Sequence, residues 1–406
     1  MRRLEFREEN KMRKNPFESL IVGEDPIRSL KRKLNKICIK KNLTEIDLTQ
    51  GNPIGKISRE YAEKLIGLIR KEECGESLSN SYCSSQGYQD FLIAISKLER
   101  KINNINISAN HILAIPGAGE GIATLLCGLK EESETGEIIL LTPFFPAYKS
   151  YVKHFGFTSK IVEFELNENL LLNRIKEKIS DSTRAIIINS PNNPSGIVYS
   201  QYFLNKIGEV LNKNSHVLAI SDEPYRELVL PDRNRASVIS NLNYDNTVVV
   251  YSFSKEGRIA GCRIGYIALH PKFPNYEKVI EALTNTLTER GVIQASTREQ
   301  MALSQCKLPL TIDWNDTMNL MKILFTDLSN IGYELIEPNG GLFICVKSPD
   351  KNGMSLHERL MDIGLGTVPG EPFGIKEYVR LSICGVTRKN YNKILNGFKD
   401  IYLSFK

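Results

Sequence analysis

Residues 248–269 read VVVYSFSKEGRIAGCRIGYIAL. A run of β-branched and aromatic residues, which predicts a buried strand, ends in a turn of small residues that holds Lys255. A lysine directly after a buried strand has a lowered pKa, and its amine is then a usable nucleophile; an exposed loop lysine is the alternative interpretation. Ser252 and Arg263 add a hydroxyl donor and a guanidinium fork, which are groups that bind phosphate.

Six short apolar runs alternate with longer amphipathic segments between residues 50 and 290: HILAI, EIILLTPFF, RAIIINS, VLAIS, TVVVYSFS and IGYIAL. This rhythm predicts βαβ units and a mostly parallel sheet in an α/β domain. Each run ends in Gly, Pro, Asn, Asp or Ser, so polar groups collect at strand ends, where open α/β sheets bind ligands.

The pattern changes after about residue 300. A long amphipathic helix is expected over residues 312–332, followed by the turn EPNGGLFICV and a helix near Ser355 to Ile363. These features predict a second, smaller α+β domain. The expected division is an N-terminal segment that packs with the small domain (1–47), a large domain (48–300) and a small C-terminal domain (301–406).

Composition excludes several classes of protein. Hydrophobic content of 41% and charged content of 25% are typical of folded globular chains. Lys and Arg (53) outnumber Asp and Glu (47), but the basic residues near the N-terminus are interleaved with acidic ones, which favours a solvated helix over a nucleic-acid partner.

No apolar run reaches the ~18 residues of a bilayer span, and the charged N-terminus is unlike a signal peptide, so we expect no membrane partner and a cytoplasmic location. Neither the eight cysteines nor the five histidines show zinc-like spacing, and no metal site is expected.

A second anion-binding element is predicted at IPGAGEGIATLL, where a strand ends before a helix. The backbone N–H groups of Gly117, Ala118 and Gly119 can hold an anion at the start of that helix. The spacing does not match the G-x-G-x-x-G pattern of dinucleotide-binding proteins, and no convincing ribose-binding acid follows, so a dinucleotide site is disfavoured.

Two further strand ends carry polar residues: SPNNPSG with Asn193, and SDEPYREL with Asp222 and Tyr225. A single Asp at a strand end is more often a helix cap, and an Asn-Pro pair is more often a turn. Their joint occurrence with Lys255 favours one shared site.

The order of these motifs, from about Leu48 to the C-terminus, resembles the class I/II aminotransferases of fold type I, the aspartate aminotransferase-like enzymes that use pyridoxal 5'-phosphate. The motifs are LTQGNPIG, Tyr82 followed by Gly87, GAGEG, PFFPAY, SPNNPSG, SDEPY, SFSKEGRIAGCRIGY and YVRLSI. The resemblance implies a mostly parallel, mixed seven-stranded sheet in the large domain. It also implies a homodimer in which Tyr82 reaches the neighbouring site.

The resemblance implies a pyridoxal-phosphate-dependent aminotransferase that moves an amino group between an L-amino acid and a 2-oxo acid. Lys255 would form the internal aldimine and carry the substrate proton. Asp222 would pair with the pyridinium nitrogen and keep it protonated. Tyr225 and Asn193 would hydrogen-bond the phenolic oxygen, and Phe145 would stack on the ring.

The remaining roles follow from the same resemblance. The cofactor's phosphate would be held by Gly117, Ala118, Gly119, Ser252, Ser254, Arg263 and, from the neighbouring subunit, Tyr82. The substrate would be bound by Gly51, Asn193 and Arg380, with Arg380 clamping its α-carboxylate.

Some features depart from the family pattern. Glu256-Gly257-Arg258 puts extra charges beside Lys255, Cys262 replaces a bulkier residue, and neither Arg290 nor Arg298 can be assigned to a second substrate carboxylate. The substrate class therefore stays open. Other pyridoxal-phosphate chemistry (a C–S β-lyase, an amino-acid oxidase or hydroxylase) and a non-catalytic effector-binding protein remain alternatives. A serine acyl-enzyme built on Ser252-x-x-Lys255 is disfavoured, because no K-T-G follows.

Overall fold

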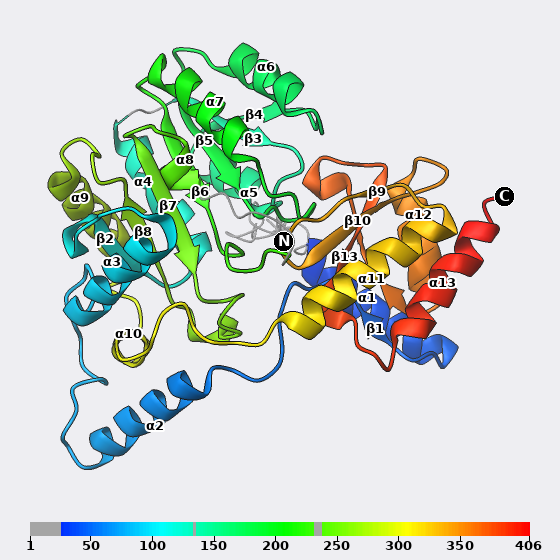
Figure 1. The fold of residues 1–406 in the computed structure, drawn as a ribbon, viewed down its shortest axis with the longest axis horizontal. Helices are drawn as coiled ribbons and strands as arrows, with labels where there is room; N and C mark the ends of the chain where they lie inside the picture. Colours follow the sequence, from blue (N-terminus) through cyan, green and yellow to red (C-terminus); the bar gives the residue numbers. More distant parts are fainter. Residues whose placement is uncertain (1–25, 133–134, 231–237) are drawn as a thin grey trace, which may run out of the picture.

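The computed structural model describes residues 26–132, 135–230 and 238–406, which form two lobes (Figure 1). The large lobe is the seven-stranded sheet with helices α2 to α10, and the small lobe holds β1, β9 to β13, α1 and α11 to α13. Of the expected N-terminal segment, residues 1–25 lie outside the described residues. The division at residues 47 and 300 stays a prediction.

The large sheet confirms the expected fold class, a mostly parallel, mixed seven-stranded sheet. Its strand order is β2 (Ile112–Ile115), β8 (Gly265–Leu269), β7 (Thr247–Ser252), β6 (Leu218–Asp222), β5 (Thr183–Asn189), β3 (Glu137–Leu141) and β4 (Thr158–Val162). Only β8 runs antiparallel to its neighbours, β2 and β7. The apolar runs did not predict β4, because this edge strand is partly exposed and reads TSKIV.

Apart from the partly exposed edge strand β4, both faces of the large sheet are buried, because alternate residues of each strand pack under a different helix layer. One face lies under α4 (Ala118–Glu132), α5 (Ala147–His154) and α9 (Tyr276–Glu289). The other lies under α3 (Gln89–Asn103), α10 (Thr297–Ser304), α6 (Glu168–Lys178), α7 (Gln201–Asn212) and α8 (Val238–Asn241). Helix α2 (Arg59–Glu73) packs against α10.

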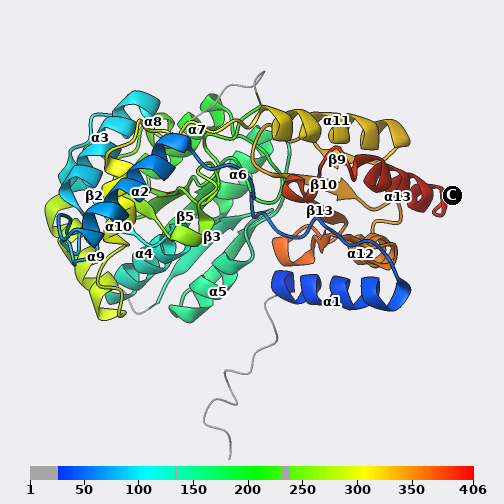
Figure 2. The ribbon, with the colours of Figure 1, turned by 90° about the horizontal axis from the view of Figure 1, so that it is seen from below.

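The small lobe is built from both ends of the described chain. Its antiparallel sheet has the order β12 (Val368–Pro369), β13 (Tyr378–Ser382), β10 (Phe343–Lys347) and β9 (Leu335–Ile336). A parallel pair, β1 (Ile46–Asp47) and β11 (Leu365–Gly366), lies beside it. Helix α1 (Pro26–Lys41) packs on β11 and α12 (Gly353–Asp362), while α11 (Asn315–Ile331) packs against α13 (Tyr391–Leu403) (Figure 2).

Local signals in the sequence explain where several helices begin and end. Ser200 and Asn352 accept hydrogen bonds from the first-turn N–H groups of α7 and α12, as N-cap residues do. Helix α11 ends at Gly332, whose φ of 115° is left-handed. Short 3-10 turns lie at η2 (Ala109–His111), η3 (Ala260–Cys262), η4 (Glu371–Phe373) and η5 (Ile383–Gly385). Within the described residues, the helices are too short or too polar to cross a bilayer.

Gly208 is a point of close packing in the large lobe. A Cβ atom at this position of α7 would lie 1.4 Å from the carbonyl oxygen of Leu242, which is backbone and has little room to move. We expect Gly208→Ala to lower the free energy of unfolding by about 2 kcal/mol. Thermal unfolding of the purified protein measures this change.

Gly128→Ala is the matched control. A Cβ at this position of α4 would meet Leu283 of α9 at an ordinary 3.4 Å. This change should be neutral or stabilising by up to about 1 kcal/mol, because alanine favours the helix. Equal unfolding midpoints for the two variants would contradict the close packing at Gly208.

Candidate active site

The carboxyl ends of the parallel strands bring the predicted residues to one edge of the large sheet. Strand β5 ends at Asn189, β6 at Asp222 and β7 at Ser252. Gly117 follows β2 at the same edge, and Arg263 returns to it because β8 runs antiparallel. The sheet topology therefore collects groups that are far apart in the sequence.

Asp222 is buried, with 6% of its surface exposed. The Tyr148 hydroxyl donates a hydrogen bond to its Oδ2 atom, whereas Oδ1 is buried and accepts no hydrogen bond from the described residues. Burial raises the pKa of this carboxyl to about 6, although Tyr148 and Lys255 both lower it. A buried carboxylate is stable only with a partner, so Oδ1 fits a cationic donor from a ligand.

Lys255 lies in the turn after β7, as expected. Its Nζ atom donates to the carbonyl oxygen of Gly51 at 2.6 Å. Burial, together with smaller effects of Arg380 and Arg263, lowers the pKa of this amine to about 8, although Cys384 and Asp222 both raise it. At pH 7 such a pKa leaves roughly a tenth of the amine neutral, so Lys255 can act as a nucleophile and as a base.

Arg380 brings a buried cation from β13 of the small lobe to the site. Its guanidinium lies between the rings of Phe343 and Phe373, 4.4 and 4.9 Å from their centroids. It donates to Asn193 Oδ1 at 3.1 Å and to the carbonyl oxygen of Thr49, while its Nε has no partner among the described residues. Burial lowers its pKa to about 10. A buried guanidinium that has no paired carboxylate among the described residues fits the carboxylate of a ligand.

Hydroxyl and guanidinium groups cluster beside the start of α4. Ser252 Oγ lies 2.7 Å from Ser254 Oγ, which accepts a hydrogen bond from Arg263 at 3.3 Å. Gly117 has a φ of 94°, and a Cβ atom there would lie 2.4 Å from the Arg263 guanidinium. The free N–H groups of the first helical turn add donors, so this cradle fits a phosphate group.

Two tyrosines of α5 were missed by the sequence reasoning. Tyr148 contacts Asp222, and the Tyr151 hydroxyl lies 3.0 Å from where a Cβ atom of Gly119 would stand, in the first turn of α4 that begins at Ala118. The PFFPAY motif contains Tyr148, but its partner lies 74 residues away in the sequence. Only the fold pairs them.

The other predicted residues differ in their surroundings. Burial raises the pKa of Tyr225, and Asn193 opposes this shift. The half-buried Phe145 ring packs edge-on against Tyr148, with centroids 5.7 Å apart. Tyr82 is 83% exposed, and none of the hydrogen bonds or ring contacts described here includes it. The functional roles of these residues stay predictions.

The arginines considered for a second substrate carboxylate already have partners in the chain. Arg290 pairs with Glu120 at 2.8 Å, and Arg298 pairs with Glu72 through two nitrogens at 2.7 and 3.0 Å. The substrate class therefore stays open.

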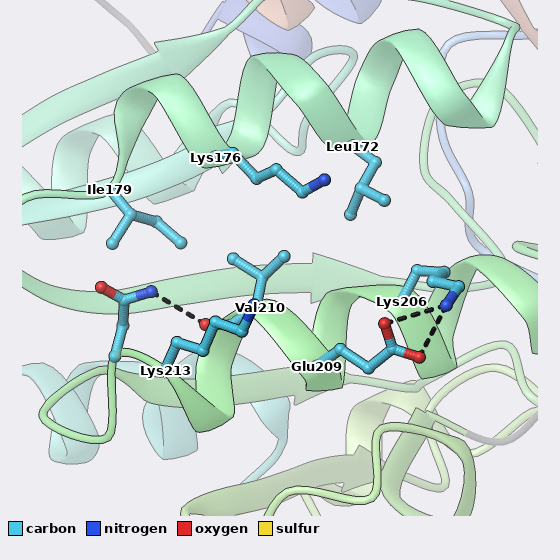
Figure 3. Close-up of a pocket in the computed structure, with 8 residues that line it drawn as sticks. Leu172, Lys176, Ile179, Lys206, Glu209, Val210 and Lys213 are labelled. Atoms are coloured by element: carbon cyan, nitrogen blue, oxygen red, sulfur yellow. Dashed lines mark hydrogen bonds and ion pairs between the residues drawn. The ribbon is translucent and has the colours of Figure 1, made fainter.

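A surface cavity of about 350 Å³ lies between α6 and α7, separate from these groups (Figure 3). Its lining combines aliphatic, basic and other polar side chains: Leu172, Lys176, Ile179, Lys206, Glu209, Val210, Lys213 and Asn214. Lys206 already pairs with Glu209 at 2.7 Å. None of the residues at the strand ends lines this cavity, so it is not the candidate site.

The chain is similar to known aminotransferases in sequence and in structure. A probable aspartate/prephenate aminotransferase of Aquifex aeolicus is 29% identical over 338 residues, which are 77% of this chain and 82% of that protein. The crystal structure of an aminotransferase from Eubacterium rectale matches with a TM-score of 0.88 and 27% identity, over 96% of this chain and 98% of that one. Aspartate aminotransferase of Thermus thermophilus, solved with maleate, shares the fold at a TM-score of 0.82 and 21% identity, over 96% of this chain and 100% of that one.

The family model described as aminotransferase class I and II matches residues 44–398. This range includes the whole large sheet, the lysine turn and Arg380. The chain belongs to the class I and II aminotransferase family.

Proposed function

We propose that this aminotransferase uses pyridoxal 5'-phosphate, attached to Lys255, to move an amino group between an L-amino acid and a 2-oxo acid. The observation that carries the proposal is the buried Oδ1 of Asp222, which has no partner in the described part of the chain and lies on the same sheet edge as a lysine of lowered pKa. When bound, the cofactor supplies a protonated pyridine ring that withdraws electrons from the bonds at the substrate α-carbon.

The residues present fit each part of this cofactor. Asp222 Oδ1 would accept the ring N–H, and the neutral amine of Lys255 would hold the cofactor by condensing with its aldehyde group, with water as the leaving group. Tyr225 and Asn193 would hydrogen-bond the phenolic oxygen, and Phe145 would cover one ring face. The phosphate would be held by Ser252, Ser254, Arg263, Gly117, Ala118 and Gly119.

The chain's own groups would then position the substrate and move its proton. Arg380 would bind the α-carboxylate through its guanidinium, while Phe343 and Phe373 exclude water from that ion pair. Once the substrate amine has taken the place of Lys255 on the cofactor, the freed Nζ would take the proton from the substrate α-carbon and would pass it to the cofactor's C4′ carbon. Gly51 borders this space, since a Cβ atom there would collide with Phe343 at 2.4 Å.

The amino donor belongs to the same proposal. The Aquifex and Thermus proteins are both named for aspartate, which makes aspartate the first donor to assay. Because Arg290 and Arg298 are paired within the chain, a neutral amino acid is the comparison donor.

The proposal includes a homodimer, in which two copies of this chain pack together. Apolar side chains are exposed on α2 and on the segments that flank it: Ile54, Ile57, Ile66, Ile69, Leu78 and Tyr82. Exposed apolar patches of this kind mark surfaces that pack against another chain. We propose that a second copy covers them and that Tyr82 contributes its hydroxyl to the partner's phosphate cradle. The expected cytoplasmic location stays a prediction.

The first test concerns Lys255. The rate at which the apoprotein captures pyridoxal phosphate should rise about tenfold per pH unit below a pKa of about 8 and level off above it, because only the neutral amine reacts. Stopped-flow absorbance measures this rate. Borohydride should then leave a pyridoxyl group on Lys255 in the wild type, and none in Lys255→Ala. The exposed Lys213→Ala is the control, and a wild type that captures no cofactor would refute the proposal.

Asp222→Asn keeps the shape of the side chain and removes its charge. We expect kcat for amino transfer to fall at least about 100-fold, because an uncharged amide cannot stabilise a protonated ring nitrogen. Tyr148→Phe, which removes only a hydrogen bond to Asp222, should have a smaller effect. Steady-state kinetics with aspartate and a 2-oxo acid measure both, and a near wild-type kcat for Asp222→Asn would rule out its assigned role.

Hybrid dimers test whether Tyr82 acts in the partner's site. Tyr82→Ala and Lys255→Ala subunits, each of low activity alone, are mixed and reassembled. If Tyr82 acts across the interface, each heterodimer has one intact site, and about a quarter of the wild-type activity should return. No recovery in verified heterodimers would show that Tyr82 acts within its own subunit, and wild-type activity of the Tyr82→Ala homodimer would show that Tyr82 does not act at all.

A further inference from the structure

Two stretches of chain join the lobes beside the turn that holds Lys255. The first connector, residues 48–58, leads from β1 to α2, and the second connector, residues 305–314, leads from α10 to α11 (Figures 1 and 2). The lysine loop, residues 253–259, makes hydrogen bonds to both connectors. The departures from the family pattern noted in the sequence, Glu256-Gly257-Arg258, lie in this loop.

Arg258 makes two of these four hydrogen bonds. Its Nη1 atom donates to the carbonyl oxygen of Lys56 in the first connector at 3.3 Å, and its Nη2 donates to that of Asp313 in the second at 3.0 Å. The guanidinium stacks on the Trp314 ring, 4.2 Å from its centroid. Its Nη1 also lies 3.0 Å from where a Cβ atom of Gly55 would stand. One side chain thus holds both connectors.

Two further hydrogen bonds bind the same segments together. Trp314 Nε1 donates to the carbonyl oxygen of Glu256 at 3.2 Å, and Lys255 Nζ donates to that of Gly51 at 2.6 Å. These two bonds therefore also fix Glu256 and Lys255 of the lysine loop against the connectors. The lysine and the arginine of this loop contact the same connector at two points.

The backbone at Arg258 is in an unfavourable conformation for this residue. Its φ is 54°, in the left-handed region, which costs a non-glycine residue about 1 kcal/mol or more and costs glycine little. The cost is offset by contacts that only the side chain makes, namely two carbonyl hydrogen bonds and the stack on Trp314. The two terminal nitrogens donate to backbone carbonyls of the connectors, whereas Nε is buried and has no hydrogen-bond partner among the described residues.

We propose that Arg258 is a positioning residue. By joining the lysine loop to both connectors, it fixes the position of Lys255 in the large lobe relative to Arg380 in the small lobe. The inference rests on the proposed function of Lys255. Arg258 acts on the reaction through Lys255 and touches neither substrate nor cofactor.

Three variants test it. Arg258→Gly removes the side chain and suits the left-handed backbone, and Arg258→Lys keeps the charge but can reach only one carbonyl oxygen and stacks poorly. Lys351→Gly is the matched control, since Lys351 has a φ of 58° in an exposed turn of the small lobe. All three are compared with the wild type for unfolding midpoint, for kcat and KM with aspartate and with a neutral donor, and for cofactor capture against pH.

We expect both Arg258 variants to fold and to lower kcat about tenfold or more, with the preference between the two donors unchanged. The midpoint of capture should move to higher pH, because a looser loop admits water around the Lys255 amine, while Asp222, Arg263, Arg380 and Cys384 still face it. The Lys351 variant should match the wild type. Trp314→Phe, which keeps a ring under the guanidinium, should lose less activity than Trp314→Ala.

Each other outcome overturns the inference. If Arg258→Gly had the wild-type kcat and the wild-type pH profile of cofactor capture, the lysine loop would keep its position without the Arg258 side chain. Wild-type behaviour of Arg258→Lys beside a defective Arg258→Gly would show that the charge alone matters. A changed donor preference would make Arg258 a substrate contact. Failure of the wild type to capture the cofactor at all would instead refute the proposed function.

Discussion

All the parallel strands of the large sheet end at one edge, and the candidate site depends on this constraint. An extended strand that is buried on both faces has to be apolar along its length, so the first polar groups appear where it ends. Asp222 and Ser252 are the last residues of β6 and β7. Lys255 follows three residues later, and Arg263 returns to the same edge because β8 runs antiparallel.

Burial explains the chemistry of these groups. Removing Asp222, Lys255 and Arg380 from water makes their charged forms costly, which raises the pKa of the carboxyl and lowers those of the amine and the guanidinium. Two of the three also keep an atom without a partner among the described residues, Asp222 Oδ1 and Arg380 Nε. In the folded chain, a cationic ring would therefore pair with Asp222, and a carboxylate would pair with Arg380.

The sequence predicted the features that depend on neighbouring residues, and it missed those that depend on contacts between distant residues. The strand of β7 and the lysine turn were predicted because their signals are local, a β-branched run followed by small residues. Strand β4 was missed, since an edge strand with exposed positions lacks the apolar pattern. Tyr148 was missed for another reason: nothing in PFFPAY shows that its hydroxyl will meet a carboxyl 74 residues away.

The sequence by itself determined the alternation of buried strands with amphipathic helices, the polar residue at each strand end and, through motif order, the family. These are properties of short segments, where hydrophobic periodicity and turn chemistry act between neighbours. Only the tertiary structure decided which oxygen of Asp222 stays free, that Arg380 lies between two rings, and that Arg258 holds both connectors. Those depend on contacts between segments up to 331 residues apart in the sequence, which only the folded chain brings together.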